Sequence, residues 1–270
     1  MKILSAISAI NFGFILSTNA ATLAHSWSFS ETTTPAAGAT VADSVGSNNG
    51  TVGAGGSPDL NVAGPNVTFN GGSAYDTGAA NNSGIAAGTD PAFIGNPAFA
   101  ISAWFNADAL TANDRIFELG SSTGDRQRFI VTAEGTGLGI RYQGGNFFYG
   151  TLITNTWYHV VAQYDGTAIG AGGAGIQVFI NGVLTAENGS GAGGALGALD
   201  IQAGNIYIGR DLGAAAGGAF DGTLDEVKLF SGNLTQGEVT SLYTTNAIPE
   251  PSTFALLGLG MAGLLIRRRR

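Results

Sequence analysis

The chain has 270 residues, no cysteine and a formal net charge of −8. Without cysteine, disulfides cannot stabilise the fold, so we expect stability to come from hydrophobic burial, helped at most by a bound metal ion. The acidic balance argues against nucleic acid and anionic membrane surfaces as partners, because both repel a negatively charged protein.

The first twenty residues have the pattern of a secretory signal peptide. Lys2 gives a positive start, residues 3–16 are almost wholly apolar, and Thr18-Asn19-Ala20 places small residues at the spacing of a cleavage site. We therefore expect residues 1–20 to be a signal peptide that is removed on export.

The segment that remains, residues 21–248, is more acidic than the whole chain. It holds eighteen acidic and six basic residues, because Glu250, Lys2 and the four terminal arginines lie outside it, and its formal charge is about −12. It is long enough to bury a large hydrophobic core without cross-links such as disulfides or a structural metal ion. We expect one large all-β domain, since no linker divides the segment and no repeat of fixed period appears in it.

Apolar residues alternate with other residues along much of this segment, which indicates β-strands. The expected strands cover residues 99–105, 128–132, 157–164, 176–180, 183–186, 205–209 and 224–230. Asn181-Gly182 predicts a type I′ hairpin turn, because both of its residues tolerate positive φ. Trp104 and Trp157 are expected to pack in the core of the sandwich.

Segments rich in glycine and alanine separate these strands, and one helix is expected after them. Residues 170–175, 189–198 and 213–219 are predicted to be loops. Thr235 and Glu238 form a capping-box pattern, with Leu234 and Val239 at the flanking apolar positions, so a helix should run from residue 236 to about 243. Many short strands and one helix in this length favour a β-sandwich.

Seven short segments occur in the order typical of a laminin-G-like, concanavalin A-like jelly-roll domain. The segments are His25-Ser26-Trp27-Ser28-Phe29, Ala42-Asp43-Ser44 with Asn48-Asn49-Gly50-Thr51, Val67-Thr68-Phe69-Asn70-Gly71, Phe99-Ala100-Ile101-Ser102-Ala103-Trp104, Trp157-Tyr158-His159-Val160 with Tyr164-Asp165-Gly166, Val178-Phe179-Ile180-Asn181-Gly182, and residues 222–230. The resemblance covers about Ala24 to Tyr243 and implies a two-sheet antiparallel sandwich over residues 24–246. It implies no single function, because this fold hosts lectins, adhesion modules, matrix proteins and glycosidases.

The C-terminal residues 247–270 resemble the PEP-CTERM sorting tail of Gram-negative bacteria. Pro249-Glu250-Pro251 precedes an uncharged apolar run over residues 254–266, and Arg267 to Arg270 follow. As a helix the run reaches only about 20 Å, short of a bilayer core of roughly 30 Å, and the arginines hold the C-terminus in the cytoplasm. The resemblance implies transient insertion of a transmembrane segment into the inner membrane, processing by an exosortase-type enzyme and delivery to the cell surface or beyond. The alternative is an ordinary C-terminal membrane anchor.

No catalytic constellation is evident in the sequence. Enzymes of the concanavalin A-like fold that cut β-glucans carry alternating carboxylates on one strand, in a pattern close to Glu-x-Asp-x-x-Glu. Asp225 and Glu226 are adjacent and point to opposite faces of a strand, so they cannot form the pair that retaining glycosidases hold about 5 Å apart. The chain has only two histidines and neither a Gly-x-Ser-x-Gly nor a His-Glu-x-x-His motif. We expect no enzymatic activity.

Asp225 is the carboxylate whose position demands a partner. If Val227 and Leu229 face the core, the period of two places Asp225 on the same inward side, where an unpartnered charge is costly. Hydrogen bonds from backbone amides of a neighbouring loop would satisfy it, and we favour this interpretation. The alternative is a calcium ion that Asp225 shares with Asp43 and with Asn48 or Asn49.

The most suggestive stretch for carbohydrate binding is the aromatic cluster that includes Phe147, Phe148 and Tyr149. Phe147 and Tyr149 share one face, which core packing would use, and Phe148 is left on the other. Aromatic rings stack on the apolar faces of sugars, and Arg141 or Asn146 could supply hydrogen bonds. Arg141, Asn146 and Phe148 are therefore the predicted sugar-binding residues.

Three functions stay open at this point. The first is a non-enzymatic protein of the exopolysaccharide matrix that binds extracellular polysaccharide or a cell-surface component. The second is a glycoside hydrolase or lyase on the same fold, and the third is a structural matrix protein without a specific ligand. We favour the first, because the paired carboxylates of the second are missing from the sequence.

Overall fold

The computed structural model describes residues 21–247 apart from residues 32–35, 66–72, 79–82, 122–123, 125, 136, 143–144, 192–196 and 213–217. The predicted signal peptide, the segment Val67–Gly71, the sorting residues Pro249, Glu250 and Pro251, and the predicted membrane segment 254–266 lie outside the described residues. Among the residues that are described, no helix is both long and apolar enough to span a bilayer.

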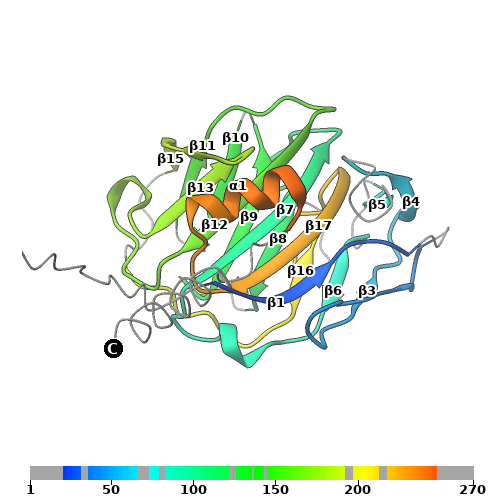
Figure 1. Cartoon of the computed structure of the whole chain (residues 1–270), viewed down its shortest axis with the longest axis horizontal. Helices are drawn as coiled ribbons and strands as arrows, with labels where there is room; N and C mark the ends of the chain where they lie inside the picture. The colour runs from blue at the N-terminus through cyan, green and yellow to red at the C-terminus, as the bar shows by residue number, and fades with distance from the viewer. Residues whose placement is uncertain are drawn as a thin grey trace, which may run out of the picture.

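Two antiparallel sheets pack face to face (Figure 1). Sheet A has the strand order β14-β13-β12-β7-β17-β5-β4, and β1 also pairs with β17. Its strands are β1 (Thr22–Trp27), β4 (Asp59–Ala63), β5 (Ser73–Asp76), β7 (Phe99–Ala107), β12 (Trp157–Tyr164), β13 (Ile176–Ile180), β14 (Val183–Thr185) and β17 (Gly222–Ser231).

Sheet B has the order β15-β11-β10-β9-β8-β16-β6-β3-β2. Its strands are β2 (Thr40–Val41), β3 (Gly50–Val52), β6 (Ile85–Ala87), β8 (Arg115–Gly120), β9 (Arg128–Glu134), β10 (Gly137–Arg141), β11 (Asn146–Tyr149), β15 (Glu187–Gly191) and β16 (Ile206–Ile208). Two 3₁₀ turns, η2 (Pro91–Phe93) and η3 (Ala171–Gly173), and one helix, α1 (Gln236–Thr245), complete the described elements. The all-β, two-sheet fold with a short C-terminal helix is confirmed.

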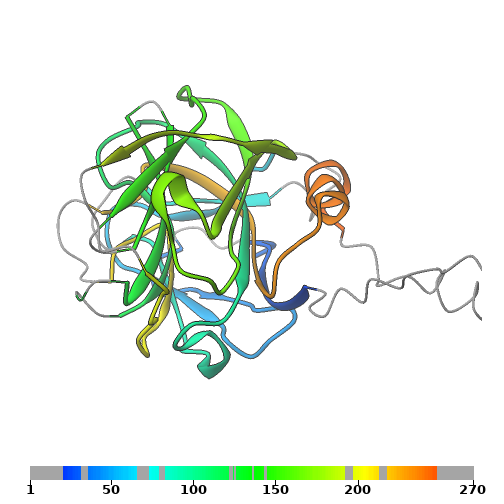
Figure 2. The same ribbon diagram turned by 90° about the vertical axis from the view of Figure 1, so that its left-hand side faces the viewer.

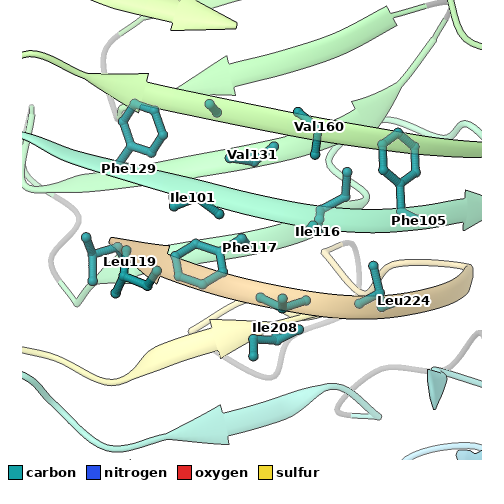
Figure 3. Close-up of a cluster of buried hydrophobic side chains, with 14 of the residues drawn as sticks. Ile101, Phe105, Ile116, Phe117, Leu119, Phe129, Val131, Val160, Ile208 and Leu224 are labelled. Carbon is teal, nitrogen blue, oxygen red and sulfur yellow. The ribbon is translucent and has the colours of Figure 1, made fainter. Parts of the chain in front are cut away.

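The main core lies between the two sheets. Alternate residues of β7, from Phe99 to Phe105, point into it and are at most 1% exposed. They meet side chains of sheet B such as Phe117, Phe129 and Val131 (Figure 3). Full burial of one such side chain contributes about 1.5–3 kcal/mol, so this interface is the main source of stability in a chain without disulfides.

The predicted strands 157–164 and 176–180 are confirmed to the residue, and Asn181 and Gly182 both have positive φ, at 51° and 79°. The prediction of a loop over residues 189–198 is wrong at its start, because Gly189 to Gly191 belong to β15. This strand pairs with β11 through backbone hydrogen bonds, which need no apolar side chain and leave no alternation in the sequence.

Helix α1 covers the outer face of sheet A, and Figure 2 shows it outside the two-sheet body. Its capping box is present as predicted: the Glu238 amide donates to Thr235 Oγ1, and Glu238 accepts from the Thr235 amide. Apolar side chains of the helix and of the residue before its cap pack on outward-facing residues of sheet A and form a second hydrophobic cluster. Its members include Leu234, Val239 and Leu242 from the helical segment and Ala100, Val161, Phe179 and Phe230 from the sheet.

The two tryptophans lie on this outer face, so their predicted place in the sandwich core is wrong. Trp104 alternates with the core residues Ala103 and Phe105, which puts it on the opposite side of β7. It is 8% exposed and stacks on Tyr243 of α1 with ring centroids 5.6 Å apart. Trp157, next to the core-packed Tyr158, is only half-buried.

A bulge in β17 changes which residues of this strand face inward. Glu226 has φ 50°, and the register with β7 shifts between Asp225 and Lys228. Leu224 and Val227 therefore both reach the inter-sheet core, although they are three residues apart. Asp225 pairs with Trp104 and shares its outward side, so the inward orientation predicted for Asp225 is wrong.

Candidate functional site

Asp43 organises the loop between β2 and β3 through hydrogen bonds to both of its carboxylate oxygens. At distances of 2.6–3.2 Å, the carboxylate accepts from the His25 ring and from the backbone amides of Ser26, Val45, Gly46 and Asn48. Burial alone would raise the pKa of Asp43, but these donors together lower it to about 2. The other ring nitrogen of His25 faces Asp90 Oδ2 at 2.9 Å.

The structure does not bring the predicted calcium ligands together. The Asp43 oxygens are taken up by N–H donors, and Asn48 and Asn49 belong to the same loop. Asp225 lies under α1 and shares no hydrogen bond with them among the described residues. Those residues also contain no group of three or more His, Asp or Glu side chains arranged to hold a metal.

Asp225 is fully buried, as the sequence predicted, but its carboxyl group has few hydrogen-bond partners. One carboxylate oxygen accepts from the Glu226 amide at 2.8 Å, and Oδ2 has no partner in the described part of the chain. Burial, with a smaller contribution from the charge of Glu226, raises the pKa of Asp225 to about 8. This carboxyl group therefore holds a proton at neutral pH.

Asp225 belongs to a set of polar residues buried between sheet A and the end of α1. Lys228 Nζ donates to Glu226 Oε2 at 2.5 Å and to Oδ1 of Asn246, the C-cap of α1, at 2.6 Å. Next to them, His159 Nε2 lies 2.9 Å from Ser102 Oγ, and burial lowers the pKa of His159 to about 3. These groups are at most 5% exposed, apart from Asn246, so they fix the helix on the sheet and offer no open reaction site.

A cavity of about 380 Å³ opens beside Phe148 on the outer side of sheet B. It is lined by Leu110, Ala112, Glu134, Gly135, Gly137, Phe148, Gly150 and Asn188. Phe147 and Tyr149 point into the core, as predicted, and the half-buried Phe148 is left outside. The Phe148 ring therefore shares this cavity with two polar residues, Glu134 and Asn188.

Glu134 is fixed in this wall as an ionised group. Arg141 donates two hydrogen bonds to its carboxylate, and the Thr132 hydroxyl and the Asn113 amide donate at 2.8 and 3.1 Å. Burial would raise the pKa of Glu134, but these donors outweigh it and hold the pKa below its ordinary value. The carboxylate is thus a fixed negative charge at the wall of the cavity, with both of its oxygens already accepting hydrogen bonds.

Glycine flanks the Phe148 ring on both neighbouring strands. Phe148 pairs with Gly139 of β10 and with Gly189 of β15. A Cβ atom on Gly139 would collide with Thr132 Oγ1 and with Glu134 Oε1, so glycine is needed there for Glu134 to reach its donors. No neighbouring side chain in the ladder covers the ring, which is the arrangement expected where a ligand approaches a sheet closely.

The predicted sugar-binding residues are close in the fold, but their roles differ. Phe148 lines the cavity, whereas Arg141 acts by holding Glu134, and Asn146 pairs with Arg141 one row further along the sheet. The sequence analysis missed Glu134 and Asn188. A predicted β9–β10 hairpin could have placed Glu134 and Arg141 on one face of adjacent strands, where the long Arg141 side chain can reach back to Glu134.

Glu118 is a second buried carboxylate of sheet B, and it lies apart from Glu134 along the sheet. Glu118 is fully buried between Arg115 and Arg128, with N–O distances of 2.8 and 3.0 Å, and burial raises its pKa. It is cross-strand partner to Ile130, four residues from Glu134 on β9, which corresponds to roughly 13 Å along the strand. Glycosidase carboxylates lie about 5–9.5 Å apart.

The family model for the concanavalin A-like lectin/glucanases superfamily matches residues 76–240. The chain belongs to this superfamily. The matched segment includes every residue of the cavity beside Phe148 and most strands of both sheets of the concanavalin A-like domain. No curated protein matches the chain in sequence.

Solved structures with the same fold include two carbohydrate-active proteins. Domain 4 of AbnA, an extracellular arabinanase from Geobacillus stearothermophilus solved in complex with arabinotriose, aligns with a TM-score of 0.58 and 20% identity, over 83% of this chain and 99% of that one. Trypanosoma rangeli sialidase in complex with the inhibitor DANA aligns with a TM-score of 0.55 and 15% identity, over 83% of this chain and 33% of that one. At these identities the likeness establishes the fold alone.

The PEP-CTERM protein-sorting motif matches residues 247–270. This motif implies export, processing by an exosortase and sorting to the cell surface in Gram-negative bacteria. The match begins at the residue after Asn246, the C-cap of α1.

Asp43 should make the stability of the domain depend on pH in the acid range. Its folded-state pKa of about 2 lies below the ordinary value of 3.8, so the stabilisation is present above about pH 4 and is lost as the pH falls through 2. The loss corresponds to about 2 kcal/mol. Urea unfolding of wild type and Asp43→Asn between pH 2 and 7 should show this component only in the wild type. An equal pH dependence in Asp43→Asn would contradict the assignment, and Asp108→Asn, at an exposed position, is the control.

Asp225 should have the opposite effect on stability. Because its folded-state pKa is raised to about 8, the unfolded chain releases the proton near pH 4 while the folded domain keeps it, so stability falls as the pH rises from 4 to 8. Asp225→Asn keeps the acceptor for the Glu226 amide and cannot ionise. We expect it to be more stable than the wild type by at least about 1 kcal/mol at pH 7, with no difference near pH 4.

Melts of wild type and Asp225→Asn with added calcium and with chelator distinguish the calcium alternative. A melting temperature that rises with calcium in the wild type alone, together with a loss of stability in Asp225→Asn at pH 7, would show that the ionised carboxylate binds a cation.

Proposed function

We propose that the protein is an exported, non-enzymatic carbohydrate-binding protein of the exopolysaccharide matrix, and that its glycan binds in the cavity beside Phe148. The observation that carries the proposal is the half-buried Phe148 ring, flanked by glycines and facing the same cavity as Glu134 and Asn188. The occurrence of arabinotriose in the complex of a structurally similar domain supports a carbohydrate as the ligand class.

The chemistry of the cavity suits a neutral sugar. The apolar face of a sugar ring stacks on an aromatic face, and its hydroxyls need acceptors and donors at the rim. The exposed Asn188 supplies its side-chain oxygen as an acceptor, because its Nδ2 already donates to the Gly150 carbonyl at 2.8 Å. Glu134 adds a fixed negative charge to the wall. A negatively charged sugar would be repelled by Glu134 and by the acidic domain as a whole.

Neither Glu134 nor Glu118 has the surroundings that the hydrolase alternative requires of its general acid. Glu134 is bound by Arg141, Thr132 and Asn113, so it stays ionised and cannot act as a general acid at neutral pH. Glu118, whose pKa is raised, is fully buried and not part of the cavity lining. Binding without cleavage fits these two environments better than glycoside hydrolysis does.

Glycan-array screening of the exported protein, followed by calorimetry on the best ligand, tests the proposed site. Phe148→Ala should weaken binding by roughly 1–3 kcal/mol, about the value of burying one large apolar side chain, while the melting temperature changes little. Ile153→Ala, which removes a 62% exposed apolar side chain in the connection between β11 and β12, is the matched control and should bind normally.

Three results would count against the proposal. A large stability loss in Phe148→Ala would show that the ring belongs to the core, and unchanged affinity would place the recognition surface elsewhere. Binding to no glycan on the array would favour the structural matrix protein, and release of reducing ends from a bound polysaccharide would favour the hydrolase.

Processing of the termini follows from the sorting motif and the signal-peptide pattern. The mature protein purified from the native host should lack residues 1–20 and the segment beyond about Pro251, because the tail serves as a temporary address. Intact-mass analysis measures both ends at once. Retention of Arg267 to Arg270 on the exported protein would show that the tail is a permanent membrane anchor.

A further inference from the structure

A second cavity lies at the open edge of the sandwich, where the chain passes from sheet A to sheet B. β14 ends at Thr185 and β15 begins at Glu187, and these are the edge strands of the two sheets. The cavity has a volume of about 520 Å³, within the usual range for small-molecule sites. Its lining consists of Tyr149, Gly172, Ile176, Gln177, Leu184, Thr185, Ala186 and Glu187.

Tyr149 is the residue that marks this cavity as a binding site. Its side chain is 3% exposed, and its hydroxyl has no hydrogen-bond partner among the described residues. An unpaired buried hydroxyl costs about 1–3 kcal/mol, so natural folds seldom keep one without a use. The hydroxyl ends at the turn η3, where a Cβ on Gly173 would lie 2.5 Å from it, and Gly172 of the same turn lines the cavity.

The walls of the edge cavity combine one donor, one acceptor and an apolar surface. Burial and the charge of Glu187 both raise the pKa of Tyr149, so its hydroxyl remains a donor. The carboxylate of Glu187 accepts no hydrogen bond in the described part of the chain, so it is available as an acceptor. Ile176, which is 7% exposed, contributes an aliphatic wall. This set complements two adjacent hydroxyls on a neutral sugar, one accepting from Tyr149 and one donating to Glu187.

The two cavities lie on opposite sides of the same pair of strands. On β11, Phe148 faces the first cavity and Tyr149 faces the second; on β15, Asn188 and Glu187 divide in the same way. β15 is the edge strand of sheet B among the residues that the structure describes, and no other described strand lies beyond it. A chain-like ligand that turns around β15 can therefore reach from one cavity to the other.

We propose that the edge cavity is a second glycan subsite, and that the ligand is a neutral polysaccharide chain that turns around β15 and occupies both cavities. This rests on the proposed function, because the first subsite is the cavity beside Phe148. Its consequence is that affinity rises with oligosaccharide length, since a monosaccharide fills one cavity only.

NMR titration of isotope-labelled protein observes the two cavities separately. The amide of Gly137 reports the first cavity and the amide of Gly172 reports the second. The probes are arabino-, xylo- and gluco-oligosaccharides of one to six units. We expect the longest ligands of the recognised series to shift both amides at one common dissociation constant.

Tyr149→Phe removes the hydroxyl and keeps the ring in the core. We expect it to weaken hexasaccharide binding about three- to tenfold, the effect of one hydrogen bond, without loss of stability. The monosaccharide shift at Gly137 should be unchanged. Tyr207→Phe is the matched control, because Tyr207 lines neither cavity, and it should bind like the wild type.

The outcomes separate the two proposals. Shifts at Gly137 without any at Gly172, or wild-type affinity of Tyr149→Phe for the hexasaccharide, would overturn the second subsite and leave the proposed function standing. Shifts at Gly172 alone would overturn the site beside Phe148 and the continuous ligand path. An absence of shifts at both amides with every probe would overturn both proposals.

Discussion

The antiparallel pairing of β7 with β12 on one side and β17 on the other is the constraint on which the rest of the structure depends. These central strands of sheet A carry the core residues on one face and the polar residues under α1 on the other. The bulge at Glu226 lets β17 keep both faces: Leu224 and Val227 fill the core, while Asp225 stays on the outer side. The same bulge divides β17, so that β5 pairs before it and β1 pairs alongside and after it.

Strands whose side chains alternate between core and surface could be predicted from the sequence, because burial of one face leaves a period of two. β12 and β13 were found to the residue for this reason. β15 was not, since Gly189 and Gly191 contribute backbone hydrogen bonds and no buried side chain. The predicted orientation of Asp225 was wrong for another reason. Glu226 has a positive φ, which reverses the faces of the strand, and nothing in the local sequence indicates that Glu226 adopts this conformation.

The candidate site could be predicted only in part. Phe148 stood out because an aromatic residue between two core-facing neighbours has to face outward. Leu110, Glu134 and Asn188 are far apart in sequence and meet through the order β15-β11-β10-β9, which local patterns do not reveal. The buried carboxylates of Asp43 and Glu134 are both surrounded by N–H donors, so their charge positions loops and side chains without any metal being required. Asp225 has one such donor and keeps its proton instead.

The place of α1 in the chain has a consequence for biogenesis. Sheet A receives β1 from residues 22–27 and β17 from residues 222–231, so it cannot close before nearly the whole domain is available, and such long-range closure is slow. The apolar outer patch around Val161 and Phe179 is covered later still, because α1 follows all the strands. Between completion of β17 and docking of α1, the chain therefore presents this apolar surface to its neighbours. Holding the last residues at the membrane until the helix has docked would keep neighbouring chains from associating through that surface.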